Sequence, residues 1–161
     1  SVLLVMDTHR HIFGAFVDTT WELQPRLQYF GNGECFLFRA LPEFEAYRWS
    51  RDNGHFMLAT KDSIALGGGG HFGLWLDGEL EHGSSHECST FNNAPLAGEE
   101  EFEVVAVESE TRFLDAGMAR IESSVKKLSE KAVKKGKMSE ADAAAHVEKT
   151  LSRARGMCVC V

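Results

Sequence analysis

Long apolar runs are absent from this 161-residue sequence, and so is an initiating methionine. No apolar run approaches the ~20 residues that a membrane-spanning helix needs, so the sequence predicts no integral membrane segment. Nothing at its start has the pattern of a signal peptide. Because the chain begins at Ser1, we expect it to be a fragment or a trimmed form, with any targeting segment lying outside it.

Cysteine is also scarce. The four cysteines, at positions 35, 88, 158 and 160, include no C-x-x-C pair of the kind that binds zinc. Their spacing indicates no disulfide framework, so we expect a reducing, intracellular compartment such as the cytoplasm. Mitochondrial and nuclear locations stay open as alternatives.

Charge is unevenly distributed along the chain, whose net charge is −7. Residues 1–108 hold 6 Lys/Arg and 17 Asp/Glu, a net charge of −11, whereas residues 109–161 hold 11 and 7, a net charge of +4. All three tryptophans and all three prolines lie in the first part. We therefore expect an acidic domain over residues 1–108 and a basic tail over residues 109–161. An acidic domain disfavours nucleic acid as a direct partner.

The first part has the pattern of a β protein. Short apolar runs bounded by turn residues recur at short spacing, and no helical period appears before Ser109. The runs that we predict as strands are residues 2–6, 12–17, 35–38, 47–49, 55–59, 62–66, 72–78 and 102–107. This pattern predicts an antiparallel two-sheet β-sandwich and, with the tail, an α+β fold.

The tail has the pattern of a helical hairpin. Gly136 is expected to end the first helix, and Ser139 to cap the second with Asp142 at the reciprocal position. The first helix has a seam with spacings of 4 and 3, formed by Leu114, Met118, Ile121, Val125, Leu128 and Ala132. The weaker apolar stripe of the second helix is formed by Ala144, Val147, Leu151 and Ala154. The tail is expected to pack on itself or on the sandwich; a separate partner is the alternative.

Glycine gathers in three places that require a permissive backbone. These are the turn Gly31-Asn32-Gly33, the run 67–70, and Gly83 with Ser84 beyond the predicted strand 72–78. Such glycines indicate that the backbone lies very close to another group, which can belong to a partner or to the rest of the same chain. Glu34 directly follows the first turn. Its carboxylate either accepts backbone N–H groups and pins the loop, or faces a partner.

Several separated motifs occur together in one order: GNGECFLF, PEFEAYRW, DSIALGGGGHFGLWLDGELEHGS and CSTFNN. In these motifs residues 2–108 resemble the TLDc domain of the oxidation-resistance protein family. The resemblance implies a two-sheet sandwich, a role in protection against oxidative stress, and regulation of the vacuolar proton-pumping ATPase. The family begins with a helical segment before Val2 and ends its last strand with a tryptophan, so we expect a domain truncated at both ends.

The resemblance also favours a partner-facing role for the GxGE motif. We predict a non-enzymatic interaction domain whose partner-binding residues are Gly31, Gly33, Glu34, Gly83 and Ser84. Subunits of the vacuolar ATPase are the expected protein partner, which would place the chain at endolysosomal membranes. No cofactor and no metal are expected.

A thiol-based redox protein is the alternative function. Cys88 has His86 two residues away, and an imidazolium beside a thiol favours the reactive thiolate. Such a cysteine would scavenge peroxide or sense it by oxidation.

Other chemical patterns are weaker. The spacing of His71, His82, His86 and Cys88 fits no standard zinc site. Ser84, Ser85, His86 and Asp77 include the residue types of a hydrolase triad but lack its Gly-x-Ser-x-Gly elbow. Cys158 lies fourth from the end, the position of a prenylated cysteine, so peripheral membrane association through lipidation is a further alternative.

Overall fold

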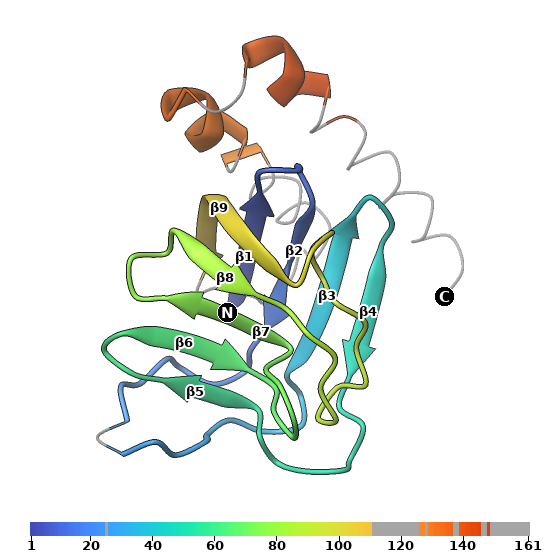
Figure 1. Ribbon diagram of the computed structural model, residues 1–161, viewed down its shortest axis with the longest axis vertical. Coiled ribbons are helices and arrows are strands. Elements are labelled where there is room, and N and C mark those ends of the chain that lie inside the picture. Colours follow the sequence, from blue (N-terminus) through green and yellow to red (C-terminus); the bar gives the residue numbers. More distant parts are fainter. Residues whose placement is uncertain (25, 111–125, 128, 137–138, 146–147, 149–161) are drawn as a thin grey trace.

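The computed structural model describes residues 1–24, 26–110, 126–127, 129–136, 139–145 and 148. The described part contains nine strands, all paired antiparallel in the order β4-β3-β2-β1-β9-β8-β7-β6-β5 (Figure 1). Their bounds are β1 Val2–Asp7, β2 Ile12–Phe16, β3 Phe36–Leu41, β4 Glu45–Arg48, β5 Met57–Ala59, β6 Ser63–Leu66, β7 Leu74–Asp77, β8 His82–Ser84 and β9 Glu101–Glu110.

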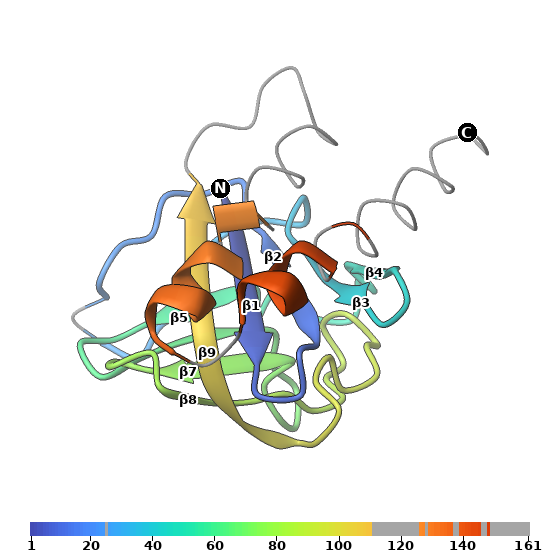
Figure 2. The ribbon, with the colours of Figure 1, turned by 90° about the horizontal axis from the view of Figure 1, so that it is seen from above.

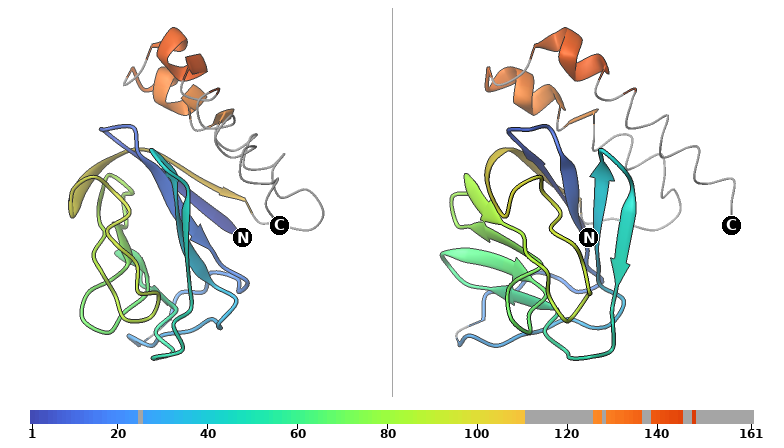
Figure 3. Two further views of the ribbon diagram at one scale, coloured as in Figure 1. Left: turned by 90° about the vertical axis from the view of Figure 1, so that its right-hand side faces the viewer. Right: turned by 45° about the vertical axis from the view of Figure 1, so that its right-hand side comes forward.

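One long strand, β9, joins two layers. Its first residues, Glu101, Phe102 and Glu103, pair with β8, whereas the segment from Val104 to Glu110 pairs with β1. The sheet turns at this strand, so that β1–β4 face β5–β8 (Figure 3, left). The structure therefore confirms the predicted antiparallel sandwich.

The core between the layers follows from the alternation of side chains along each strand. Leu3 and Val5 of β1 point inward and are buried. They share one cluster with side chains from both layers: Phe13, Ala15, Leu37, Leu66, Leu74, Leu76 and Phe102. The rings of Phe13 and Phe102 meet edge to face, with centroids 5.0 Å apart. This contact holds the two layers together at the turn of β9.

The outer face of β1–β4 is apolar as well, and residues of the tail cover part of it. The alternate residues of β1, Val2, Leu4 and Met6, are buried on this side together with Ala132 and Ala143 of the tail. Figure 2 shows the helical residues of the tail above β1 and β9. Packing on the sandwich, one of the two uses predicted for the tail, is thus what the described residues show.

Polar contacts accompany this packing. Lys131 Nζ donates to the carbonyl oxygen of Val107, at 3.3 Å, and to the carboxylate of Glu108. Arg10, in the turn between β1 and β2, lies 3.3 Å from the carboxylate of Asp142. Each pair joins a sandwich residue to a tail residue.

The predicted helix boundaries in the tail are confirmed. Gly136 has φ +69, and its N–H donates to the carbonyl oxygen of Val133 at 2.9 Å. Ser139 Oγ accepts the N–H of Asp142 at 3.2 Å, as a helix cap does. The predicted stripe of the second helix is wrong at Ala144, which is exposed, whereas Ala143 is buried. The seam residues 114, 118, 121, 125 and 128, and the stripe residues 147, 151 and 154, lie outside the described part of the chain.

Two strand predictions need correction. Residues 82–84, which are not among the predicted strands, form β8, because they pair with β7 on one side and β9 on the other. The predicted strand 47–49 is β4, Glu45–Arg48, because pairing with β3 fixes its ends. Among the described residues, no helix has the length and apolar character that crossing a membrane requires.

Gly14 tests the packing of β2 on β1. A Cβ at this position would overlap the carbonyl oxygen of Leu3, which is part of the backbone and cannot rotate away. We predict that Gly14→Ala lowers the free energy of unfolding by at least about 2 kcal/mol in a urea titration. Gly54→Ala is the control, because its Cβ would meet only Phe56, at 3.8 Å. Equal stability of the two variants would contradict this account of the strand pair.

Ala143 and Ala144 test whether the tail covers the outer face. We predict that Ala143→Glu lowers the free energy of unfolding by about 1–3 kcal/mol, because it places a charge against apolar side chains. Trypsin should then cleave faster at Lys134 and Lys135. Ala144→Glu should leave both measurements unchanged, since Ala144 is exposed. The same response from both variants would show that the tail does not pack in this register.

Candidate functional site

The turn before β3 is held by its own asparagine. Gly31 adopts φ +95, a conformation that favours glycine. Asn32 Oδ1 accepts the backbone N–H of Glu34 at 2.9 Å, and the Asn32 carbonyl oxygen accepts the N–H of Cys35 at 3.2 Å. This side-chain-to-backbone turn fixes residues 31–35 at the entrance of β3.

Both glycines of the turn pack against the connection between β4 and β5 or the start of β5. A Cβ at Gly33 would overlap the six-membered ring of Trp49, and a Cβ at Gly31 would lie 3.1 Å from Met57 Sδ. Trp49 is itself held in place, because its Nε1–H donates to the Asn53 carbonyl oxygen at 2.7 Å. Gly33 therefore permits the turn to lie directly on Trp49, and Gly31 permits it to approach Phe56 and Met57.

Glu34 is exposed, and its carboxylate does not hold the turn. The prediction that this carboxylate pins the loop is wrong, because Asn32 takes that role. Within the described part of the chain the structure gives the Glu34 carboxylate no hydrogen bond or ion pair. The turn that Asn32 and Trp49 hold in place thus presents the exposed Glu34 carboxylate.

Gly83 and Ser84, the other residues predicted to bind a partner, are buried in β8. A Cβ at Gly83 would lie 2.5 Å from Phe102 Cζ and 2.7 Å from Leu76 Cδ2. Gly83 therefore permits the core to close beneath the turn of β9. The structure places these two residues in the interior and separates them from the exposed turn at Glu34.

The glycine run 67–70 lies against the loop that follows β8. Thr90 Oγ1 accepts the N–H of Gly68 at 2.9 Å and donates to Asn53 Oδ1 at 2.7 Å. Asn53 thus links the glycine run to Trp49, because its carbonyl oxygen also accepts the indole N–H of Trp49. The sequence motif CSTFNN contains Thr90, but its spacing gave no sign of a partner 37 residues away.

Cys88 does not have the surroundings of a reactive thiol. It is 2% exposed, and its Sγ donates to Asn93 Oδ1 at 3.0 Å. Burial raises the pKa of the Cys88 thiol, which disfavours the thiolate. The ring of His86 lies 3.6 Å from the carboxylates of both Glu100 and Glu101. The imidazole that was expected to activate Cys88 therefore has acidic neighbours.

No hydrolase triad is assembled among the described residues. Ser85 is buried, and its Oγ donates to the Gly73 carbonyl oxygen at 2.6 Å. Asp77 contacts His82, at 3.2 Å, while His86 lies beside the two glutamates. In the part of the chain that the structure describes, no group of three or more His, Cys, Asp or Glu side chains could hold a metal ion.

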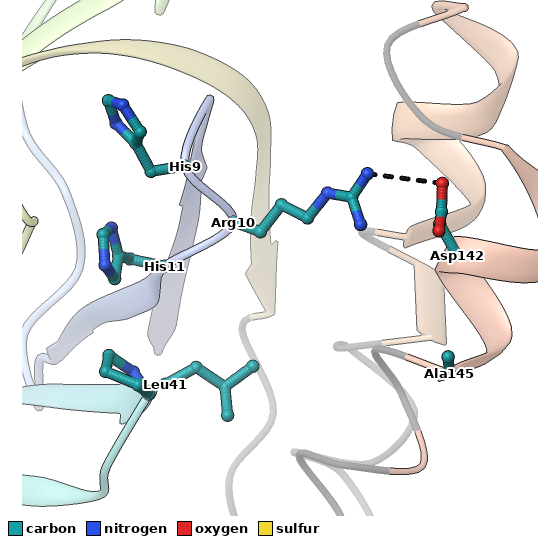
Figure 4. A pocket seen from close by; sticks show the side chains of 7 residues that line it. His9, Arg10, His11, Leu41, Asp142 and Ala145 are labelled. Carbon is teal, nitrogen blue, oxygen red and sulfur yellow. Dashed lines mark hydrogen bonds and ion pairs between the residues drawn. The ribbon is translucent and has the colours of Figure 1, made fainter.

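A cavity of about 330 Å³ lies between the β1–β2 turn and the tail (Figure 4). The cavity is lined by His9, Arg10, His11, Leu41, Pro42, Asp142 and Ala145. The Ser139 hydroxyl, followed by the Arg10 guanidinium, holds the pKa of Asp142 below its ordinary value. Since Arg10 and Asp142 are paired with each other, we assign this cavity to the junction of tail and sandwich.

Comparison with known proteins identifies the first two thirds of the chain. The sequence model of a family described as the TLDc domain matches residues 1–109. Oxidation resistance protein 1 of Bos taurus is 42% identical over 108 residues, which cover 66% of this chain and 12% of that protein. Oxidation resistance protein 1 of Xenopus tropicalis is 43% identical, and nuclear receptor coactivator 7 of Homo sapiens 42%, over the same length and the same share of this chain. They are covered to 12% and 11% of their own lengths.

The burial of Cys88 leads to a prediction on its reactivity. Iodoacetamide alkylates the thiolate, so we expect Cys88 in the folded chain to react at pH 8 at least about tenfold more slowly than in the urea-unfolded chain. The rate should rise only at a pH above the ordinary thiol range. Since the folded pKa is raised, the stability that Cys88 contributes is present below its unfolded pKa and is lost as the pH rises through the folded value.

Peptide mapping by mass spectrometry measures this rate without any substitution. Other cysteine-containing peptides of the same digest provide the internal reference. Alkylation of Cys88 at the rate of the unfolded chain would contradict the buried position and restore the thiol redox function.

Proposed function

We propose that this chain, which belongs to the TLDc domain family, is a non-enzymatic protein-interaction domain that acts in resistance to oxidative stress. The match of the family to residues 1–109 supports the proposal, as do relatives named oxidation resistance protein 1. The chain spans about an eighth of the length of these relatives. The proposal therefore concerns what the domain binds, and the sandwich of residues 1–108 is the part that would bind it.

One observation carries the interaction function: a rigid turn exposes a carboxylate that has no partner among the described residues. Asn32 and the packing of Gly33 on Trp49 fix the turn, so the backbone at Glu34 does not have to be ordered when a partner binds. A preorganised contact loses less conformational entropy on association. A charged residue in this position is better suited to recognition than to stabilising the fold.

The vacuolar proton-pumping ATPase is the partner that we propose, because the family resemblance implies it. The chain would then work inside the cell, at the membranes that carry this pump. Its contact with those membranes would pass through the protein partner.

The alternative of a thiol redox protein receives less support. Cys88 is buried, its pKa is raised, and the nearby His86 is engaged by acidic residues. Peroxide reduction requires an accessible thiolate. Glu34 is exposed, as a binding residue has to be, whereas Cys88 is buried and not accessible to a peroxide.

Capture of the soluble catalytic sector of the vacuolar ATPase by the immobilised chain tests the proposal. We expect Glu34→Ala to weaken capture at least about fivefold, because a central contact residue contributes more than about 1 kcal/mol to binding. Thermal melts of both proteins should coincide, since Glu34 is exposed.

Glu43→Ala is the matched control. Glu34 precedes β3 and Glu43 follows it, so the two exposed carboxylates lie at opposite ends of the same strand. Capture should be unchanged in this variant. Failure of the well-folded parent chain to capture the sector would reject the ATPase as partner, and equal loss in both variants would reject the turn as the contact.

A further inference from the structure

The outer face of the first layer is apolar, although the outward side chains of an antiparallel sandwich are commonly polar. Every residue of β1, from Val2 to Asp7, is buried. The buried side chains of this face form one cluster drawn from β1, β2, β3 and β9: Val2, Leu4, Met6, Ile12, Phe38, Ala40, Leu41, Val105 and Ala106. An apolar face of this extent needs a cover, because large exposed apolar patches mark sites of protein contact.

The cover of this face is not part of the domain to which the face belongs. The residues of the face lie within residues 1–109, which match the TLDc domain. The helical residues of the tail lie above β1 and β9 (Figure 2), and Ala132 and Ala143 are buried there, beyond the end of that match. The face thus belongs to the matched domain, whereas a segment outside the match covers it.

The described part of the tail is an imperfect cover. Its buried apolar residues in the cluster are Ala132 and Ala143, whose small side chains bury little apolar area. Ser129 lies three residues before Ala132 and therefore on the same side of the helix. The Ser129 side chain is buried, and its Oγ has no hydrogen-bond partner among the described residues. Burial of an unpaired hydroxyl opposes docking, so a helix without it would fit the face better.

Glu108 adds a requirement of charge to this face. Its side chain is 14% exposed, and its carboxylate pairs with Lys131 Nζ of the tail. A carboxylate that is largely enclosed is destabilising when its cation is removed. Any helix that replaces the tail on this face therefore has to supply a cation at Glu108.

We infer that the outer face binds an amphipathic helix of a partner protein, and that the tail occupies this face in competition with that helix. The partner helix would have apolar side chains at the positions of Ser129, Ala132 and Ala143, and a lysine or arginine that pairs with Glu108. This is the mode in which an amphipathic helix lays its apolar face on a hydrophobic surface. The inference goes beyond the proposed function, since Glu34 is not among the residues of this face.

Fluorescence anisotropy of a labelled synthetic peptide tests the inference. The probe has the sequence of residues 126–145 and carries Ser129→Ala. We expect the full chain with Ala143→Glu, which releases the tail, to bind this probe at least about tenfold tighter than the chain with Ala144→Glu, because a tethered tail competes at about millimolar effective concentration. Ala144 is the matched control, since it is exposed.

Lys131→Glu releases the tail in a second way, because it places a carboxylate against Glu108. Its control is Lys134→Glu, at an exposed residue of the same helix. The same difference in affinity for the probe is expected, and both chains should melt cooperatively. This pair decides the question if Ala143→Glu does not fold.

A charge exchange at Glu108 then locates the bound probe. In the chain with Ala143→Glu, we expect Glu108→Lys to weaken binding at least about tenfold, as for an enclosed charge pair, and a probe with Lys131→Glu to restore it. Glu103→Lys, at an exposed glutamate of the same strand, should leave binding unchanged. A probe that retains Ser129 should bind at least about fivefold more weakly, because its hydroxyl is buried without a partner.

Several results would overturn the inference. They are no binding of the probe by a folded chain with a released tail, equal binding by that chain and its control, and no restoration by the exchanged charge. A probe with Ser129 that binds as tightly as the Ser129→Ala probe would contradict the imperfect fit of the tail. Capture of the ATPase sector through Glu34 is a separate measurement, so either result can fail while the other stands.

Discussion

The shared strand β9 is the constraint on which the rest of the molecule depends. Its first three residues pair with β8 and its remainder with β1, so the two layers are one sheet turned on itself. Phe102 lies where the strand changes partner, and its ring packs on Phe13 of the opposite layer. Gly83 makes this possible, because any Cβ there would meet the ring of Phe102. The inner core and the position of every connection follow from this turn.

Glycine serves the same purpose at several points of this fold. Gly33 permits contact with Trp49, Gly67 and Gly73 permit contact with Cys88, and Gly83 permits contact with Phe102. In each case the group that approaches the glycine is a side chain of the same chain. The exposed Glu34 differs from these positions, since its removal would leave the packing of the turn intact. The packing of the turn thus depends on Gly33, and the recognition that we propose depends on its neighbour Glu34.

Opposite charges of the tail and the sandwich meet in two ion pairs. The acidic part contributes Glu108 and the basic part Lys131 to one ion pair, while Arg10 and Asp142 form another with the charges reversed. Exposed ion pairs contribute little to stability, typically about 0–1 kcal/mol, so the burial of Ala132 and Ala143 against the outer face stabilises the docked tail more than the ion pairs do. This arrangement covers apolar side chains of β1.

The sequence predicted most of the strands, the sandwich that they form, and the helix ends at Gly136 and Ser139. These features depend on alternating apolar residues, turn residues and capping residues, which act within a few positions of the chain. β8 could not be predicted in this way, since His82, Gly83 and Ser84 become a strand only through the two strands that pair with them. The burial of Gly83, Ser84 and Cys88 was also beyond a local pattern, as it depends on side chains from other strands and loops. At the GxGE motif the residue types marked the turn, but only the packing of Gly33 on Trp49 and the hydrogen bond to Asn32 Oδ1 show that the turn is held without the Glu34 carboxylate.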